Sequence, residues 1–89
     1  MNRIAVIGGR DSVLGFRALG LETCIAETGE QAKAAIHRMA KESYAIIYLT
    51  EHLAAQIPAE IERRRGDTAP AIILIPGREG SLGIGMAGV

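Results

Sequence analysis

Three runs of consecutive apolar residues constrain the fold of this chain more than any other feature of its sequence. They lie at residues 4–7, 45–49 and 71–75. None alternates with polar residues and each is bounded by turn-forming residues, which is typical of short strands buried on both faces. A weaker run at residues 21–25 contains a threonine and a cysteine, so we expect that strand to lie nearer to an edge.

The clearest helical pattern follows the weaker run. Thr28 and Gln31 have the spacing of a capping box, in which two side chains satisfy the backbone donors of the first helical turn. Apolar residues then recur on a single helical face. They are Ala32, Ala35, Ile36, Met39 and Ala40.

Two further helical segments are predicted. The first begins at Asp11 or Ser12, either of which can cap it, and ends at Gly20. The other follows Thr50 and contains Pro58. Because a proline inside a helix costs about 3 kcal/mol, we expect a break there, with Pro58 opening a second short helix.

The resulting order of elements is β-α-β-α-β-α-β, which predicts a parallel sheet covered by helices. We therefore expect an α/β fold, a small Rossmann-like or flavodoxin-like three-layer domain over residues 1–76. Its four parallel strands should have the order 2-1-3-4. Residues 77–89 are rich in glycine and show no helical or strand period, so a flexible tail is expected there.

Composition excludes several classes of function. Ten basic and ten acidic residues give a formal net charge of zero, which argues against a nucleic acid partner. The run at residues 63–65 is basic, but at the end of a helix it favours a contact with the helix dipole. No apolar stretch approaches the roughly 18 residues needed to cross a bilayer, so direct membrane insertion is not expected. The single cysteine, Cys24, fits a reducing, cytoplasmic setting.

The first strand is followed by Gly8 and Gly9, where nucleotide-binding folds of this kind keep a phosphate loop. The G-x-G-x-x-G fingerprint needs a second glycine that lets the backbone approach a pyrophosphate. That position is Arg10 if the motif starts at Gly8, and Asp11 if it starts at Gly9. A loop that only turns the chain is therefore favoured over a phosphate site.

The residues needed for a phosphoacceptor site or a metal site are also missing from the sequence. A phosphoacceptor receiver domain needs an aspartate where this chain has Thr50, and a lysine after residue 41, where none occurs. His37 and His52 have no second ligand at metal-binding spacing. We expect no catalytic residue, cofactor or metal. Two alternatives stay open, a nucleotide- or phosphate-binding regulatory module and a small enzyme that uses Cys24.

Several segments resemble one family in the same order along the chain. Residues 11–20, DSVLGFRALG, are similar to a segment of the F subunit of the V-type/A-type rotary ATPases, and so are residues 48–51, 70–76 and 80–85. The resemblance implies a non-catalytic central-stalk (rotor) protein that binds the coiled-coil D subunit of the stalk and rotates within the hexamer of A and B subunits. Such a protein helps couple ATP synthesis or hydrolysis to ion transport. It would be cytoplasmic, peripheral on the membrane-bound complex, and monomeric outside it.

Members of that family usually continue past the glycine-rich segment as a C-terminal helix along the stalk, whereas this sequence stops at Val89. Either the sequence is truncated or this member is unusually short. Candidate partner-binding residues are Arg17 in the signature segment and Leu82, Ile84 and Met86 near the end. The alternatives are a solvated Arg17 and packing of the three apolar residues on the chain's own domain.

Overall fold

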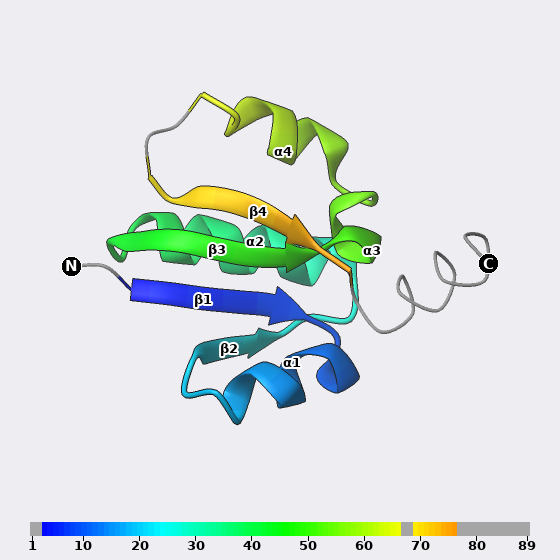
Figure 1. The fold of residues 1–89 in the computed structure, drawn as a ribbon. Helices are drawn as coiled ribbons and strands as arrows, with labels where there is room; N and C mark the ends of the chain where they lie inside the picture. The colour runs from blue at the N-terminus through cyan, green and yellow to red at the C-terminus, as the bar shows by residue number, and fades with distance from the viewer. Residues whose placement is uncertain (1–2, 67–68, 77–89) are drawn as a thin grey trace.

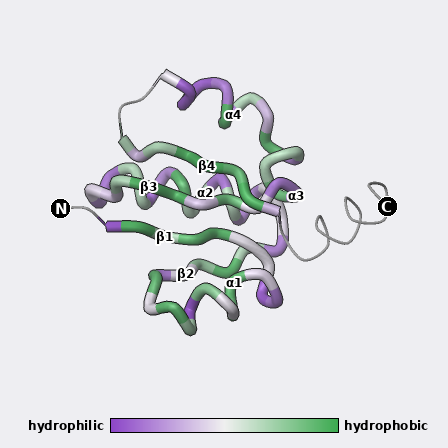
Figure 2. Tube along the Cα trace, viewed as in Figure 1, coloured by the Kyte–Doolittle hydropathy of each residue, from purple (hydrophilic) through white to green (hydrophobic). Residues whose placement is uncertain are grey.

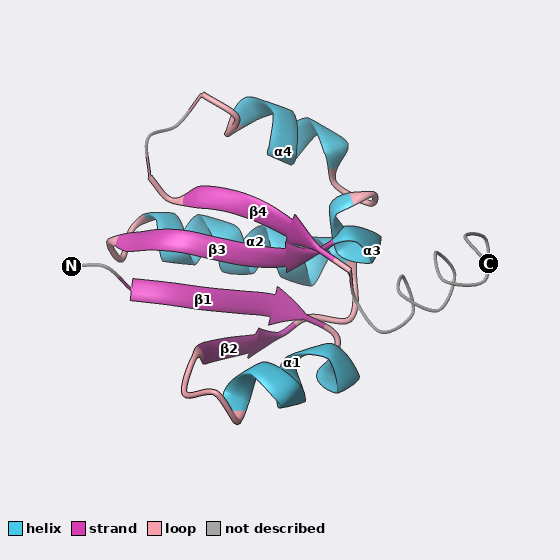
Figure 3. Cartoon of the chain, in the orientation of Figure 1, coloured by secondary structure: helices cyan, strands magenta, loops and turns pink. Residues whose placement is uncertain are grey.

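A computed structural model describes residues 3–66 and 69–76 of the chain, and its strands and helices alternate as the sequence predicts (Figure 1, Figure 3). The segment after Thr50 is broken into two short helices, with Pro58 at the first position of the second. The elements are β1 (Arg3–Gly8), α1 (Arg10–Arg17), β2 (Glu22–Ile25), α2 (Gly29–Ala40), β3 (Tyr44–Thr50), α3 (Glu51–Ala54), α4 (Pro58–Arg63) and β4 (Ala71–Ile75).

The four strands form one parallel sheet in the order β2-β1-β3-β4. This confirms the predicted α/β fold and strand order. The weaker strand, β2, lies at an edge as expected. Figure 1 shows α2 behind the sheet, and Figure 2 shows that the strands are mostly hydrophobic along their length.

The main core lies between the sheet and α2. The apolar face predicted for α2 is confirmed, because Ala32, Ala35, Ile36 and Met39 are buried there. These side chains pack on inward-facing residues of the two central strands and on α3. The sheet and α3 contribute Ala5, Ile7, Ile47, Leu49, Leu53 and Ala54.

The capping interaction at the start of α2 is also confirmed, with one shift. The Gln31 backbone N–H donates to Thr28 Oγ1 at 3.2 Å, and Thr28 is the N-cap. Gln31 Oε1 accepts from the backbone N–H of Glu27 at 2.7 Å, one residue earlier than the usual box. The two ends of the interaction fix both the helix start and the preceding chain.

The opposite face of the sheet is covered unevenly. Val6 of β1 and Val13 of α1 are fully buried together on that side, since α1 packs against β1 and β2. Right-handed crossovers place α1 there alone among the described helices, because the step from β1 to β2 runs opposite to the later steps across the sheet. The β3 and β4 half of this face therefore has no helix over it in the described residues.

This arrangement corrects the prediction that residues 71–75 are buried on both faces. Ile73 is 42% exposed and its neighbour Leu74 is 45% exposed, although they point to opposite faces of the sheet. A continuous apolar run fitted a central strand, but the strand order leaves β4 at an edge. Burial of a strand depends on what packs against it, which its own composition does not determine.

Candidate functional site

The loop between β1 and α1 is the first candidate, because phosphate sites of this fold lie there. Gly8 has a packing reason to be glycine, since a Cβ at that position would lie 2.6 Å from Cγ2 of Thr50 on the neighbouring strand. Real Cβ atoms are not found so close to another side-chain atom. The glycine thus allows β1 and β3 to approach at the end of the sheet.

The start of α1 already holds a carboxylate from this chain. Glu27 Oε2 accepts a hydrogen bond from the Arg10 backbone N–H at 3.1 Å, and a Cβ on Gly9 would lie 3.3 Å from Glu27 Oε1. Helix N-termini attract anions through their free N–H groups and dipole, so Glu27 takes the position that a phosphate would need. The loop turns the chain and is capped internally.

This contact also corrects the predicted cap of α1. The helix begins at Arg10 with Gly9 as its N-cap, so neither Asp11 nor Ser12 caps it. The cap comes instead from Glu27, which lies 17 residues away in the sequence. Short-range patterns cannot reveal such a cap. At the other end the predicted stop is confirmed, because Gly20 has a positive φ of 85° three residues after the helix.

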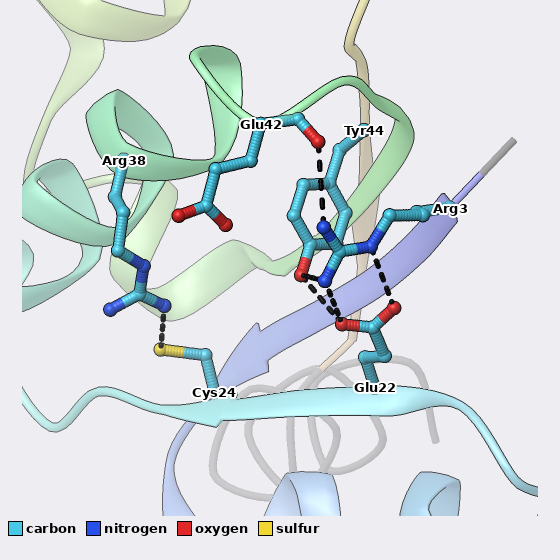
Figure 4. Close-up of polar contacts among 6 residues, drawn as sticks. All are labelled: Arg3, Glu22, Cys24, Arg38, Glu42 and Tyr44. Atoms are coloured by element: carbon cyan, nitrogen blue, oxygen red, sulfur yellow. Dashed lines mark hydrogen bonds and ion pairs between the residues drawn. The ribbon is translucent and has the colours of Figure 1, made fainter. Parts of the chain in front are cut away.

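Cys24 lies at the exposed edge of the sheet and is half-buried. Nη2 of Arg38 contacts its sulfur at 3.7 Å (Figure 4), at a groove of about 670 Å³ between β2 and α2. A cysteine nucleophile needs an adjacent base, and neither histidine lines this groove. The alternative of an enzyme that uses Cys24 therefore gains no support from the geometry.

A polar cluster lies at the end of the sheet where the strands begin, and it joins β1, β2 and β3 (Figure 4). Arg3 forms an ion pair with Glu22 at 2.9 Å and stacks on the Tyr44 ring, 4.2 Å from its centroid. The Tyr44 hydroxyl donates to Glu22 at 2.6 Å. The hydrogen bond from Arg3 lowers the pKa of Glu22, and the bond to Glu22 raises the pKa of Tyr44. The cluster stabilises the edge strand and offers no free group for chemistry.

A second ionic cluster surrounds Glu60 of α4, whose side chain is only 2% exposed. His37 of α2 lies 3.0 Å from its carboxylate, Arg64 lies 2.7 Å away, and Arg63 also pairs with it. Burial alone would raise the pKa of Glu60, but the hydrogen bonds from Arg64, His37 and Arg63 outweigh it and lower the pKa to about 2. Through His37 the cluster holds α4 to α2.

This cluster refines the prediction for the basic run. Arg63 and Arg64 bind Glu60, and Arg65 pairs with the exposed Glu62 at 3.4 Å. All three arginines are therefore paired with glutamates of α4, which argues against a basic patch for an acidic partner. The sequence holds a signal for this arrangement, since spacings of three and four residues place the charges side by side on a helix.

The predicted partner-binding residues divide into two groups. Arg17 is exposed on α1, and its Nε donates to Thr23 Oγ1 of β2 at 3.3 Å, so it lies along the edge of the sheet. Leu82, Ile84 and Met86 lie outside the described residues, as does the whole segment 77–89. Of the four residues, the structure therefore places only Arg17.

The sequence analysis missed an apolar surface, which we call the open face. It is the β3 and β4 half of the sheet on the side that carries α1. The predicted strand order held a signal for it, since one crossover helix cannot cover four strands. The open face consists of Ile46, Tyr48, Ala71, Ile73 and Ile75, which strand register and alternation place on one side, with the buried Thr50 opposite Ile75 at its end.

Within residues 3–66 and 69–76, no group of three or more potential metal ligands occurs. The same part of the chain has no helix with the length and apolarity required for a membrane span.

Comparisons with known proteins point to one family. The family described as ATP synthase (F/14-kDa) subunit matches residues 4–89. The F subunit of the V-type ATP synthase of Fusobacterium nucleatum is 47% identical over 89 residues, covering 100% of this chain and 85% of that protein. The F subunit of the V-type ATP synthase of Clostridium botulinum (strain Eklund 17B) is 44% identical over 84 residues, which are 94% of this chain and 82% of that protein.

The similarity extends to A-type enzymes. The F subunit of the A-type ATP synthase of Methanothermobacter thermautotrophicus is 36% identical over 81 residues, which are 89% of this chain and 76% of that protein. The proteins matched are accessory subunits of the ATP synthase complex and not its catalytic ones. Since the family match covers nearly the whole chain, this chain belongs to the ATP synthase (F/14-kDa) subunit family.

Proposed function

We propose that this chain is a non-catalytic rotor subunit in the central stalk of a V-type/A-type ATP synthase. In this role it binds the coiled-coil D subunit of the stalk inside the hexamer of A and B subunits. It helps to couple ATP synthesis or hydrolysis to ion transport. The observation that carries the proposal is the match over residues 4–89 to an ATP synthase subunit family, together with 47% identity to a V-type F subunit over the whole chain.

The proposal places the protein on the cytoplasmic side of the membrane-bound complex, held by its protein partners and monomeric outside the assembly. The internal carboxylate at the start of α1 supports a role in binding over one in nucleotide chemistry, because Glu27 occupies the N–H group of Arg10 that a phosphate would use. We accordingly expect ATP and ADP to leave the melting temperature of the isolated chain unchanged. A shift of several degrees with either nucleotide would favour the alternative of a regulatory nucleotide-binding module.

We propose that Arg17 contributes to partner binding, together with Leu82, Ile84 and Met86. Arg17 is a suitable contact because it is exposed and its hydrogen bond to the neutral hydroxyl of Thr23 leaves its charge uncompensated by that partner. An exposed guanidinium can pair with a carboxylate of a partner at little desolvation cost. The three apolar residues would supply the hydrophobic part of the contact, and burial of apolar surface is the dominant favourable term in most protein–protein association.

Co-purification with the coiled-coil D subunit tests the proposal. We expect the unsubstituted chain to be retained by the D subunit and Arg17→Glu to be retained more weakly. Lys33→Glu is the matched control, because Lys33 is an exposed cation on α2, the helix on the other side of the sheet. Failure of the unsubstituted chain to bind would overturn the central-stalk function. Equal retention of the two variants would remove only Arg17 from the contact.

A further inference from the structure

The side of α1 that faces away from the sheet is apolar, and Figure 1 shows α1 at the outside of the sheet. We call Leu14, Gly15, Ala18 and Leu19 the outer face of α1. Leu14 and Gly15 lie four and three residues before Ala18, so these three share the side of the helix opposite to the buried Val13. Leu14 is 48% exposed and Leu19 is 74% exposed. A group of exposed apolar side chains on one side of a helix is a candidate contact surface.

Gly15 has no packing reason to be glycine within the described part of the chain. A Cβ built on Gly15 would meet nothing within 4 Å there, and its φ is not in the left-handed region. Alanine would therefore fit at this position. Inside a helix, glycine is less favourable than alanine by roughly fivefold in the folding equilibrium. The chain thus accepts a loss of stability at Gly15 that its own described contacts do not require.

Two other glycines show what an internal reason for this residue looks like. A Cβ on Gly8 would lie 2.6 Å from Thr50 Cγ2, and a Cβ on Gly29 would lie 2.7 Å from Gln56 Cβ. Both glycines allow two elements of this chain to approach each other closely. Gly15 lies on an exposed side of α1, so the close approach that it allows is open to another molecule.

We infer that the outer face of α1 packs against a helix of a partner protein, with Gly15 at the point of closest approach. The partner helix presents small side chains opposite Gly15, a carboxylate near Arg17 and a cation near Asp11. This inference rests on the proposed function and deepens it, because the coiled-coil D subunit is a partner built of helices.

The sizes of the side chains on the outer face fit a helix as the occupant. Two helices pack with their axes about 8 to 10 Å apart, and the distance depends on the side chains at the contact. Gly15 and Ala18, three residues later, provide small side chains at the centre of the face. Leu14 and Leu19 flank them and are exposed enough to enter the grooves of a second helix.

Charged residues at the two ends of the face define the charges that the partner needs. Asp11 is exposed in the first turn of α1, and Arg17 is exposed in the last turn. Their separation along the sequence corresponds to about 9 Å along the axis of a helix. A partner helix with a cation and a carboxylate at a similar spacing meets both charges. The apolar interior of a membrane does not, because burial of unpaired charges is costly.

The melting temperature of the isolated chain tests whether the fold itself needs Gly15. Gly15→Ala should raise the melting temperature by about 4 to 8 °C, because alanine is favoured in a helix and has room at this position. Ala34→Gly is the matched control, since it makes the reverse change at an exposed position inside α2 and should lower the melting temperature by a similar amount. A lower melting temperature for Gly15→Ala would show that the fold requires this glycine, and it would overturn the inference.

Titration with the coiled-coil D subunit tests the contact in the full-length chain. Gly15→Leu should weaken binding at least about tenfold, because the larger side chain holds the two helices apart. Ala34→Leu is the matched control, since it introduces the same side chain at an exposed position on α2, on the other side of the sheet, and should leave the affinity unchanged. Far-ultraviolet circular dichroism checks that both variants are folded.

The outcomes separate this inference from the function on which it rests. Equal affinities of the Gly15→Leu and Ala34→Leu variants for the D subunit would overturn only the assignment of the outer face. Failure of the unsubstituted chain to bind the D subunit would overturn the proposed function, and this inference with it. A dimer of the unsubstituted chain in sedimentation equilibrium that Gly15→Leu dissociates would also overturn the inference, in favour of a second copy as the occupant.

Discussion

The two edge strands of the sheet are stabilised in different ways. β2 carries polar side chains that are tied to neighbouring elements, through Glu22 to Arg3, Thr23 to Arg17 and Cys24 to Arg38. β4 has the sequence AIILI and no side chain that can form a hydrogen bond. Its support comes from backbone pairing with β3 and from contact with α3.

The difference shows which edge is adapted to water. Short, polar edge strands resist pairing with other chains, whereas an apolar edge strand with exposed side chains invites further packing. β2 has the first character, while β4 has the composition of a strand inside a sheet. The described part of the chain therefore has one polar edge strand, β2, and one apolar edge strand, β4, whose side chains are partly exposed.

Substitution of Glu60 should produce the largest loss of stability on the β4 side. Glu60→Gln removes the charge that binds His37, Arg63 and Arg64, and we expect a loss of about 2 to 3 kcal/mol in the free energy of unfolding at pH 7. Urea denaturation measures it. Glu62→Gln is the matched control, because the Glu62 side chain is 70% exposed and should change stability by less than about 0.5 kcal/mol. Equal effects of the two substitutions would contradict the role of the Glu60 cluster.

The contribution of Glu60 should also fade in acid. Its pKa is lowered from 4.5 to about 2 in the folded protein, so its stabilisation is complete well above pH 4.5 and is lost as the pH falls towards 2. The difference in unfolding free energy between the unsubstituted chain and Glu60→Gln should shrink by about 2 kcal/mol between pH 7 and pH 3. Denaturation curves of both proteins at each pH test this, and a constant difference would show that the carboxylate charge is not the cause.

Local signals in the sequence predicted most of the fold, but they did not predict the contact of Glu27 with α1 or the exposure of β4. The strands, the box at Thr28 and Gln31, and the break at Pro58 all depend on neighbouring residues, and the structure confirms them. The contact of Glu27 with the start of α1 and the exposure of β4 depend on residues far apart in the sequence. Periodicity cannot encode such contacts, because it describes one element at a time.

The candidate site also depends on contacts between residues that are far apart in the sequence. The glycine spacing in the sequence favoured a loop that only turns the chain over a phosphate site, and the carboxylate of Glu27 adds a physical reason that only the fold supplies. The open face needed the strand order and the side of each crossover to be combined. Exposed apolar residues on one strand appear in the sequence as a core strand, since the same composition serves both.

A matched pair of lysine substitutions sharpens the contrast between the two edges. Ile25 on β2 is 39% exposed and Ile73 on β4 is 42% exposed, so exposure alone predicts equal effects. We expect Ile73→Lys to cost about 1 kcal/mol more than Ile25→Lys, because Ile73 lies opposite Tyr48 in the sheet, whereas Ile25 ends β2 opposite Gly8, which has no side chain. Chemical denaturation of the full chain gives both values. Equal losses would place the two edges in the same solvent environment.

The smallest effect is expected at the polar edge itself. Glu22→Gln keeps an acceptor for Arg3 and Tyr44 but removes the charge, and the ion pair with Arg3 is exposed to solvent. Ion pairs that are exposed to solvent contribute little to stability and are screened by salt. We therefore expect Glu22→Gln to lower the melting temperature slightly, and we expect this fall to be smaller still in about 0.5 M salt. The pKa of Glu22 is lowered in the folded protein. Its contribution to stability is therefore present at a pH above its pKa in the unfolded chain, and it is lost on acidification. A loss as large as that of Glu60→Gln would mean that β2 depends on this charge as strongly as α4 depends on its buried carboxylate, and the proposed contrast between the two edges would fail.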